Sequence, residues 1–154
     1  MKAKKLDENV VAQNIKDIIE NLGVSATIEV ARENSTFFVD IASDDSSLLI
    51  GKHGVNLDSL QFALAVRIKT TTGQEDFEIF VDVNNWRRQK ESKLKEMAKN
   101  IEEKVAETGN EQALFNLTPS ERRVIHTYLG ESTKVATESQ GEGADRHLII
   151  KPKS

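Results

Sequence analysis

The segment Gly51-Lys52-His53-Gly54 is the part of the chain best suited to contact a charged ligand. Its two glycines stand three residues apart, and a residue without a Cβ lets the backbone approach a ligand closely. The residues between them supply a lysine charge and a histidine that can gain one. A helix is expected to begin just after the loop, and the first amides of a helix attract anions. This chemistry suits phosphate, although a helix C-cap glycine followed by a tight turn explains the four residues equally well.

The loop differs from the nucleoside-triphosphate loop, which requires Gly-x-x-x-x-Gly-Lys-Ser/Thr. Ser46 stands where the first glycine belongs, and His53 replaces the hydroxyl residue. A nucleoside-triphosphate site is therefore not expected here.

Arg122 and His126 form a second pair with ligand-binding chemistry. They are four residues apart on an expected helix and so share one face, whereas Val124, Ile125 and Tyr128 are expected to point toward a core. Arginine offers a planar fork of donors to phosphate. Histidine offers a donor, and a charge at low pH. The alternative is a solvated helix face with a chance i,i+4 pair, which the spacing alone slightly favours.

The distribution of charge leaves room for a nucleic-acid ligand in spite of a net charge of −4. Residues 1–50 carry five Lys/Arg and nine Asp/Glu, whereas residues 51–154 carry 16 of each. Local patches set the field that a ligand meets. Basic side chains gather in the neutral part with only Glu91 among them: Arg87, Arg88, Lys90, Lys93 and Lys95.

Catalytic, metal and cofactor sites are not expected. The chain has no cysteine, which excludes disulfides, thiolate catalysis and cysteine-based zinc sites. Its three histidines, His53, His126 and His147, do not stand at metal-ligand spacing with a carboxylate. No nucleophile, base and orienting group occur together. Gly141-x-Gly143 lacks the third glycine of a dinucleotide loop, since Arg146 stands there.

Membrane insertion and secretion are not expected either. No run approaches the roughly 20 apolar residues of a membrane span. The start of the chain, residues 1–5, has no apolar segment behind it long enough for a signal peptide. The expected location is therefore the cytoplasm.

The first half of the chain predicts the order helix, strand, strand, helix, glycine loop, helix, strand. Asp7 can cap the first helix, Asn56 can cap the helix after the loop, and Gly23 and residues 70–73 end these two helices. The strands are expected at residues 27–31, 36–42 and 75–83. Phe38 and Phe80 alternate away from the core face, where they cover helix packing or stack bases.

The second half predicts a long helix over residues 85–107 and then a smaller unit. Ala113, Phe115 and Leu117 alternate as a short strand. Thr118 to Glu121 has the pattern of a capping box with proline at the first helical position. Two further strands are expected at residues 134–139 and 146–150.

The order of the first half, with its Gly-x-x-Gly loop between two helices, resembles a type II KH domain, in which that loop clamps single-stranded nucleotides. Arg122-x-x-x-His126 resembles the Arg-x-x-x-His domain of single-stranded nucleic-acid binding proteins. Residues 137–146 are similar to the closing signature of that domain in the bacterial Jag (SpoIIIJ-associated) family. The resemblance includes the loop and its following helix, residues 50–61, and the join Asp82-Val83 with Trp86-Arg87.

The resemblance implies an α+β protein with a KH domain at 1–84, a connecting helix at 85–109 and an Arg-x-x-x-His domain at 110–154. It implies a non-enzymatic regulator that binds single-stranded RNA, or single-stranded DNA, and acts in cell elongation and division. A small KH-domain protein is the implied partner. The expected contacts are Gly51, Lys52, His53, Gly54, Arg87, Arg88, Arg122, His126 and Arg146.

Two departures from the family pattern bear on these expectations. Members commonly carry an additional N-terminal domain and a basic linker, which this sequence does not show before its KH-like segment. Ala144, Asp145 and His147 replace the more basic residues expected around Arg146. The alternative function is a protein-interaction adaptor that docks on a membrane-insertase or cell-division complex. RNA sequence preference, oligomeric state and the regulated process do not follow from the sequence.

Overall fold

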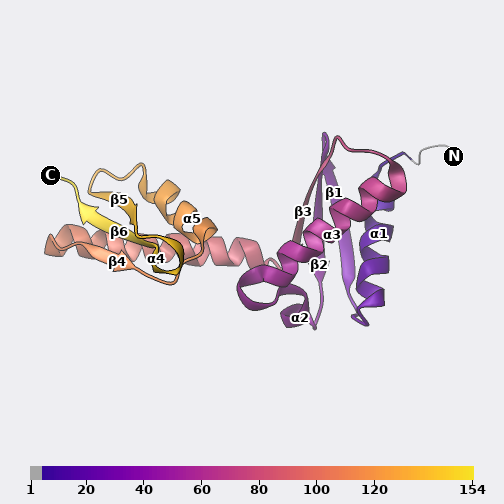
Figure 1. The fold of residues 1–154 in the computed structure, drawn as a ribbon, viewed down its shortest axis with the longest axis horizontal. Helices are drawn as coiled ribbons and strands as arrows, with labels where there is room; N and C mark the ends of the chain where they lie inside the picture. Colours follow the sequence, from indigo (N-terminus) through magenta and orange to yellow (C-terminus); the bar gives the residue numbers. More distant parts are fainter. Residues whose placement is uncertain (1–4) are drawn as a thin grey trace. The chain divides into compact units, whose positions relative to one another are not determined.

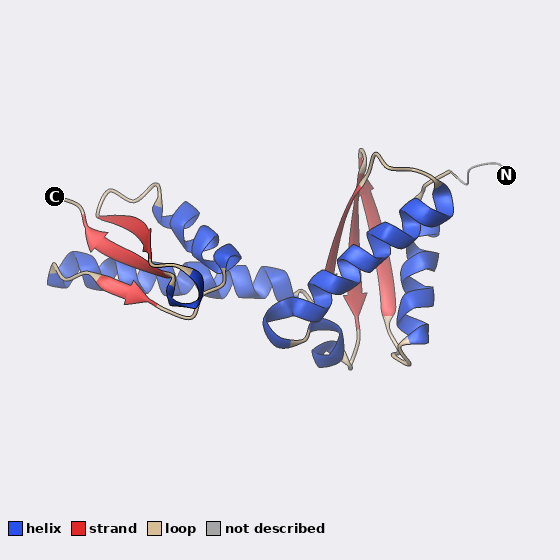
Figure 2. Ribbon diagram, viewed as in Figure 1, coloured by secondary structure: helices blue, strands red, loops and turns tan. Residues whose placement is uncertain are grey.

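A computed structural model describes residues 5–154, and the chain passes from one compact unit to a second between Arg87 and Arg88. Residues 1–4, which belong to the segment considered above for a signal peptide, lie outside the described part. Both units combine helices with a three-stranded sheet (Figures 1 and 2), which confirms the predicted α+β class.

The first unit follows the predicted element order. It consists of α1 (Glu8–Asn21), β1 (Thr27–Glu33), β2 (Thr36–Ala42), α2 (Ser46–Ile50), the 3₁₀ turn η1 (Lys52–Gly54), α3 (Val55–Thr72) and β3 (Glu78–Val83). The sheet order is β1-β2-β3, with β1 antiparallel to β2 and β2 parallel to β3. The parallel pair requires a crossover, and α2, η1 and α3 supply it.

One face of this sheet forms the core of the first unit. Phe37, Val39 and Ile41 of β2 are buried, as are Ile79, Val81 and Val83 of β3. They pack against apolar residues of α1 and α3, including Ile15, Leu57 and Leu64. Figure 1 shows these two helices beside the sheet. The apolar residues that alternate along the strands therefore pack against the apolar faces of the helices, as the sequence pattern predicts.

Phe38 and Phe80 lie on the opposite face of this sheet. They are register partners, and their rings stack at 5.7 Å between centroids and 17° between planes. The half-exposed Phe80 lies outside the core of the first unit. The expectation that these rings cover helix packing is wrong, because the core residues that meet α1 and α3 point the other way.

Two local predictions for the first unit are wrong. Asn56 does not cap α3: the N-cap residue is Gly54, and the Asn56 amide donates a hydrogen bond to Leu48 O at 2.8 Å. β3 begins at Glu78 rather than at residue 75, because the segment before Glu78 turns toward β3, with Phe77 N donating to Glu75 O at 3.0 Å.

The second unit contains most of α4 (Trp86–Thr108), then β4 (Gln112–Leu114), α5 (Pro119–Leu129), β5 (Val135–Gln140), the 3₁₀ turn η2 (Gly143–Asp145) and β6 (His147–Pro152). The sheet order is β4-β6-β5, and both strand pairs are antiparallel. Helices α4 and α5 pack on it through one apolar cluster: Ala98, Val105, Ile125, Leu129, Val135, Leu148 and Ile150. The long helix thus contributes buried residues to the second core in addition to joining the units.

Two side chains of the second unit depart from the sequence prediction. Phe115 lies beyond the end of β4 and is exposed, while Leu114 and Leu117 pack against the core. Asn116 has a φ of 59°, and this turn breaks the alternation that Phe115 and Leu117 suggested. Tyr128 is 39% exposed rather than directed into the core.

Candidate nucleic-acid interface

The glycine loop presents its two polar side chains to solvent. Lys52 and His53 are exposed, and α2 just before them anchors the loop through the buried Leu49 and Ile50. His53 has a φ of 54°, a conformation that few non-glycine residues adopt. The turn therefore projects both cationic candidates away from the body of the unit.

The glycines are needed for internal packing as well as for the turn. A Cβ on Gly51 would lie 2.5 Å from Asn56 Cγ, and one on Gly54 would lie 2.6 Å from Trp86 Cη2. Gly51 is also the C-cap of α2, and its N–H donates to Ser47 O at 3.0 Å. The C-cap interpretation of the loop is thus correct for Gly51, and it coexists with the exposed charges of Lys52 and His53.

The N-terminus of α3 lies directly behind the loop. No side chain of residues 5–154 caps this end of the helix. The first amides of an α-helix lack intrahelical acceptors and carry a partial positive charge. The N–H of Val55 already donates to Lys52 O, and the acidic Asp58 of the first turn is paired with Arg87. The exposed Lys52 and His53 beside this helix terminus suit a phosphate group.

Arg87 is held against the same helix terminus. Its Nε donates to Val81 O at 2.9 Å, and its Nη2 donates to Asp58 Oδ1 at 2.9 Å in the first turn of α3. Its backbone N–H donates to Asp82 Oδ1 at 3.0 Å. Arg87 therefore ties β3 to α3, and this structural role accompanies any contact with a ligand. Arg88 is exposed and begins the second unit.

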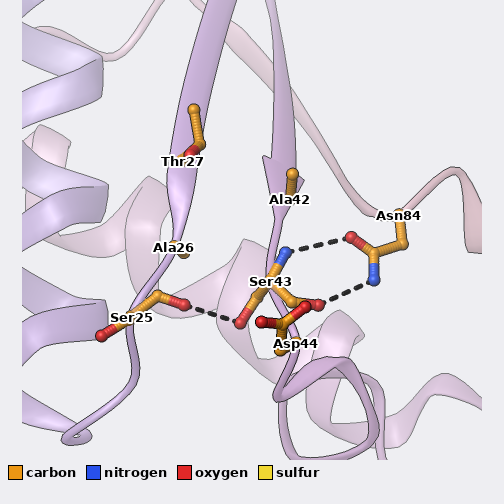
Figure 3. Close-up of a pocket in the computed structure, with 7 residues that line it drawn as sticks. All are labelled: Ser25, Ala26, Thr27, Ala42, Ser43, Asp44 and Asn84. Atoms are coloured by element: carbon orange, nitrogen blue, oxygen red, sulfur yellow. Dashed lines mark hydrogen bonds between the residues drawn. The ribbon is translucent and has the colours of Figure 1, made fainter.

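A polar pocket of about 480 Å³ at the ends of β1 and β2 shows how the segment before α2 is fixed. Asn84 Oδ1 accepts from Ser43 N at 3.0 Å, and Asn84 Nδ2 donates to Ser43 O at 2.8 Å (Figure 3). Ser43 Oγ donates to Ser25 O at 2.7 Å. These bonds tie the β3–α4 turn to the segment that leads into α2. Among the described residues that line the pocket, only Asp44 is charged, so the pocket does not suit phosphate.

In the second unit, Arg122 is fixed by backbone carbonyls. Its Nη1 donates to Leu117 O at 2.7 Å and to Arg146 O at 3.3 Å. The guanidinium is half-buried. It brings together the start of α5 and the segment before β6, so Arg122 and the backbone of Arg146 are neighbours.

His126 lies one turn further along α5 and is exposed. Its Nδ1 is 2.5 Å from Oγ1 of Thr137 on β5. This contact orients the imidazole. The structure thus places Arg122 and His126 on one helix face, as predicted, and adds Thr137, which the sequence analysis missed because nothing in the pattern pairs residues 11 apart.

The start of α5 is held by a complete capping box. Thr118 Oγ1 accepts from Glu121 N at 3.2 Å, and Glu121 Oε2 accepts from Thr118 N at 2.7 Å. Lys90 Nζ lies 2.8 Å from Glu121 Oε1. Burial raises the pKa of Glu121, but the hydrogen bonds from Lys90 and Thr118 and the Lys90 charge outweigh burial and lower that pKa overall.

Two aromatic rings at the same end of the second sheet were not among the predicted contacts. Phe115 and His147 stack with 4.4 Å between centroids and 25° between planes. The two residues are far apart in the sequence, so only the pairing of β4 with β6 reveals the contact.

In the described part of the chain, none of the helices has an apolar stretch of the length that a bilayer span requires. Over the same residues, no group of three or more histidine or acidic side chains is arranged to hold a metal ion.

Residues 92–152 match the family model of the Arg-x-x-x-His domain. The chain is 34% identical to the RNA-binding protein KhpB of Clostridium symbiosum over 84% of its own length and 58% of that protein. It is 28% identical to KhpB of Bacillus subtilis over 90% of its length and 67% of the relative. For KhpB of Lactiplantibacillus plantarum the identity is 29%, over 86% of the chain and 41% of the relative. The chain therefore spans from two fifths to two thirds of these relatives.

Proposed function

We propose that this chain binds single-stranded RNA and regulates bacterial cell elongation and division. The premise is that it carries an Arg-x-x-x-His domain and is related to the KhpB proteins of the Jag family. The match to the Arg-x-x-x-His family and the relatives, which are named RNA-binding proteins, support an RNA-binding role. For the first unit we propose the type II KH fold. Its element order, its sheet order and its Gly-x-x-Gly turn support this assignment.

The observation that carries the proposal is the surface formed by the glycine loop and α3. Lys52 and His53 are exposed beside a helix N-terminus that no side chain of the described residues caps. Phosphate contacts dominate the affinity of proteins for nucleic acids. A strand that lies along this loop would place a phosphate between two basic side chains and the helix amides. This arrangement needs no base pairing and suits single strands.

The surface around Arg122 and His126 supplies a second set of phosphate contacts in this proposal. Arg122 keeps donors beyond those that bind Leu117 O and Arg146 O, since a guanidinium has five N–H groups. His126 and Arg146 are exposed. Single-stranded DNA offers the same phosphates, so the comparison of RNA with DNA belongs to the test.

A specific observation also favours a protein partner. Val55, Phe62 and Val66 are exposed at spacings of seven and four residues along α3, and Phe62 is 71% exposed. This spacing puts them on one helical face. An exposed apolar stripe of this kind is typical of an interaction site. We propose a small KH-domain protein as the partner. An adaptor that docks on a membrane-insertase or cell-division complex is the alternative function.

The test is fluorescence anisotropy with an unstructured labelled RNA and its DNA counterpart. The double variant Lys52→Asp/His53→Asp should lose at least about tenfold in RNA affinity, or about 1.4 kcal/mol, with an unchanged circular dichroism spectrum.

The matched control is Lys16→Asp/Lys69→Asp, which removes at least as much positive charge from exposed sites of the same unit. It should stay within about twofold of the parent chain, because only local phosphate contacts set the affinity. Equal losses of affinity in both variants would mean that the loop acts only through the net charge of the protein and makes no local phosphate contact. If the parent chain binds no RNA but binds a membrane-insertase or cell-division protein, and Phe62→Glu abolishes that binding, the adaptor function is favoured instead.

A further inference from the structure

The Phe115–His147 pair is an aromatic surface that the core of the second unit does not use. Phe115 is 57% exposed, and it is absent from the apolar cluster that holds α4, α5 and the sheet together. One face of its ring stacks on His147 at 4.4 Å. The residue is more than half exposed, so part of the ring remains open to solvent. A large exposed ring contributes little to folding, so a role in binding would explain its position.

The sheet register explains why the two rings meet. Leu114 of β4 and Leu148 of β6 are the last pair of an antiparallel ladder. Phe115 directly follows Leu114 and His147 directly precedes Leu148, so the two residues are neighbours at the end of this ladder. Leu148 belongs to the apolar cluster and Leu114 packs against it, whereas Phe115 and His147 are not part of that cluster. The strand ends at Leu114, and the left-handed turn at Asn116 follows directly after Phe115.

The ring of His147 is held in place by the backbone. Its Nδ1 is 2.8 Å from Asp145 O, and because a carbonyl oxygen only accepts, Nδ1 must be the donor. The imidazole is therefore oriented before any ligand arrives. Gly141 keeps the turn before it tight, since a Cβ there would lie 2.7 Å from Asp145 O.

The same short segments carry the proposed phosphate-binding arginine. Arg122 Nη1 bonds Leu117 O, just after Phe115 in the chain, and Arg146 O, directly before His147. The aromatic pair and the guanidinium therefore lie at the same end of the sheet. Aromatic platforms next to cationic grooves are how proteins hold single-stranded nucleic acids, with bases on the rings and phosphates on the cations.

We propose that the Phe115–His147 stack is a nucleobase-binding subsite, in which one unpaired base lies on the open face of Phe115 while Arg122 and His126 contact the neighbouring phosphates. This inference rests on the proposed RNA-binding function and extends it from the backbone to a base. Stacking is tolerant of sequence, because every base has a flat aromatic face. The subsite consequently selects unpaired over paired strands rather than one base over another.

The test compares Phe115→Leu with Phe115→Tyr, using a single-stranded RNA of about 12 nucleotides, within the range of known single-strand sites. Leucine keeps the apolar volume but removes the ring, whereas tyrosine keeps the ring. We expect Phe115→Tyr to bind like the parent chain and Phe115→Leu to lose at least about fivefold in affinity. The salt dependence should be unchanged in both, because no phosphate contact is lost.

Measurements with an intact RNA and with an RNA that has abasic positions distinguish failure of the subsite from failure of the proposed function. The parent chain should bind an RNA with abasic positions more weakly than the intact RNA. Phe115→Leu and Phe115→Tyr should bind this abasic RNA with equal affinity. If the parent chain binds RNA but Phe115→Leu and Phe115→Tyr have the same affinity, the subsite is refuted while RNA binding stands. In that case the exposed ring is free to serve a protein partner. If the parent chain binds neither RNA nor its abasic form, the proposed function itself has failed.

Discussion

The substitution Gly54→Ala is expected to destabilise the first unit, because the new methyl group has no room. Its Cβ would lie 2.6 Å from Trp86 Cη2 and 2.7 Å from Trp86 Cζ3, closer than real side chains approach. The φ of Gly54 is also +80°, and this left-handed conformation costs a residue with a Cβ about 1–2 kcal/mol. Overpacking typically adds about 1–3 kcal/mol. The free energy of unfolding should therefore fall by about 2–5 kcal/mol.

Gly73→Ala is the matched control in the same unit. Gly73 has a φ of +70°, but a Cβ at this position would meet nothing within 4 Å. The control should lose only the backbone contribution of about 1–2 kcal/mol. The difference between the two variants isolates the overlap with Trp86.

Urea unfolding followed by tryptophan fluorescence measures both variants, since Trp86 is the only tryptophan of the chain. The midpoint should fall further for Gly54→Ala than for Gly73→Ala, with similar slopes in all three proteins. If Gly54→Ala is no less stable than Gly73→Ala, the packing explanation of this glycine is wrong. The residue would then be needed only for the turn and for the approach of a ligand.

Three further predictions concern the second unit and the intact chain. Glu121→Gln should lower the stability of the second unit near neutral pH by about 1–3 kcal/mol, through loss of the charged hydrogen bond from Lys90. In the fold, the pKa of Glu121 lies below its ordinary value of 4.5. The stabilising contribution of the charged carboxylate is therefore complete above pH 4.5 and is lost as the pH falls through the lowered pKa. The unfolding curves of parent and variant should consequently converge in acid. Arg122→Ala should reduce the salt slope of RNA binding by about 0.7 per lost single-strand phosphate contact; an unchanged slope would favour a solvated helix face. The affinity of the intact chain should rise steeply with RNA length beyond the roughly four nucleotides of one KH site, because linked sites gain effective concentration; a flat length series would favour the adaptor.

The regular elements followed from local patterns. The alternation of Phe37, Val39 and Ile41 with polar neighbours identified the buried face of β2, and the capping box identified the start of α5. These signals depend on residues within a few positions of one another. The alternation of buried and exposed positions and the requirements of helix capping determine these signals, so they can be recognised in a single sequence.

The misassigned residues depend on interactions and backbone conformations that sequence periodicity does not describe. Asn56 has the composition of a helix cap, but Leu48 O offers its side chain a better acceptor in the folded chain. The alternation of Phe115 with Leu117 suggested a strand, but the left-handed turn at Asn116 interrupts it. Periodicity contains no information about either event, because one depends on a hydrogen bond to the preceding helix and the other on the backbone conformation of a single residue.

The candidate site shows the same division. The types and spacing of Lys52, His53, Arg122 and His126 identified candidate phosphate contacts from the sequence alone. The roles of their neighbours required the structure: Trp86 fills the space beside Gly54, Thr137 orients His126, and two backbone carbonyls hold Arg122. A sequence pattern can name a charged group, but it does not show what fixes that group in place.

The most direct measurement of RNA binding on the proposed surfaces is ultraviolet crosslinking of the intact chain to unstructured RNA, followed by mass spectrometry of the crosslinked peptides. The proposal predicts crosslinks in the peptide that contains residues 51–54 and in those that contain Phe115, Arg122 or Arg146. Lys52→Asp/His53→Asp should reduce the first set and leave the second. Crosslinks confined to the outer sheet face of the first unit, at Phe38 and Phe80, or no crosslinks at all, would contradict it.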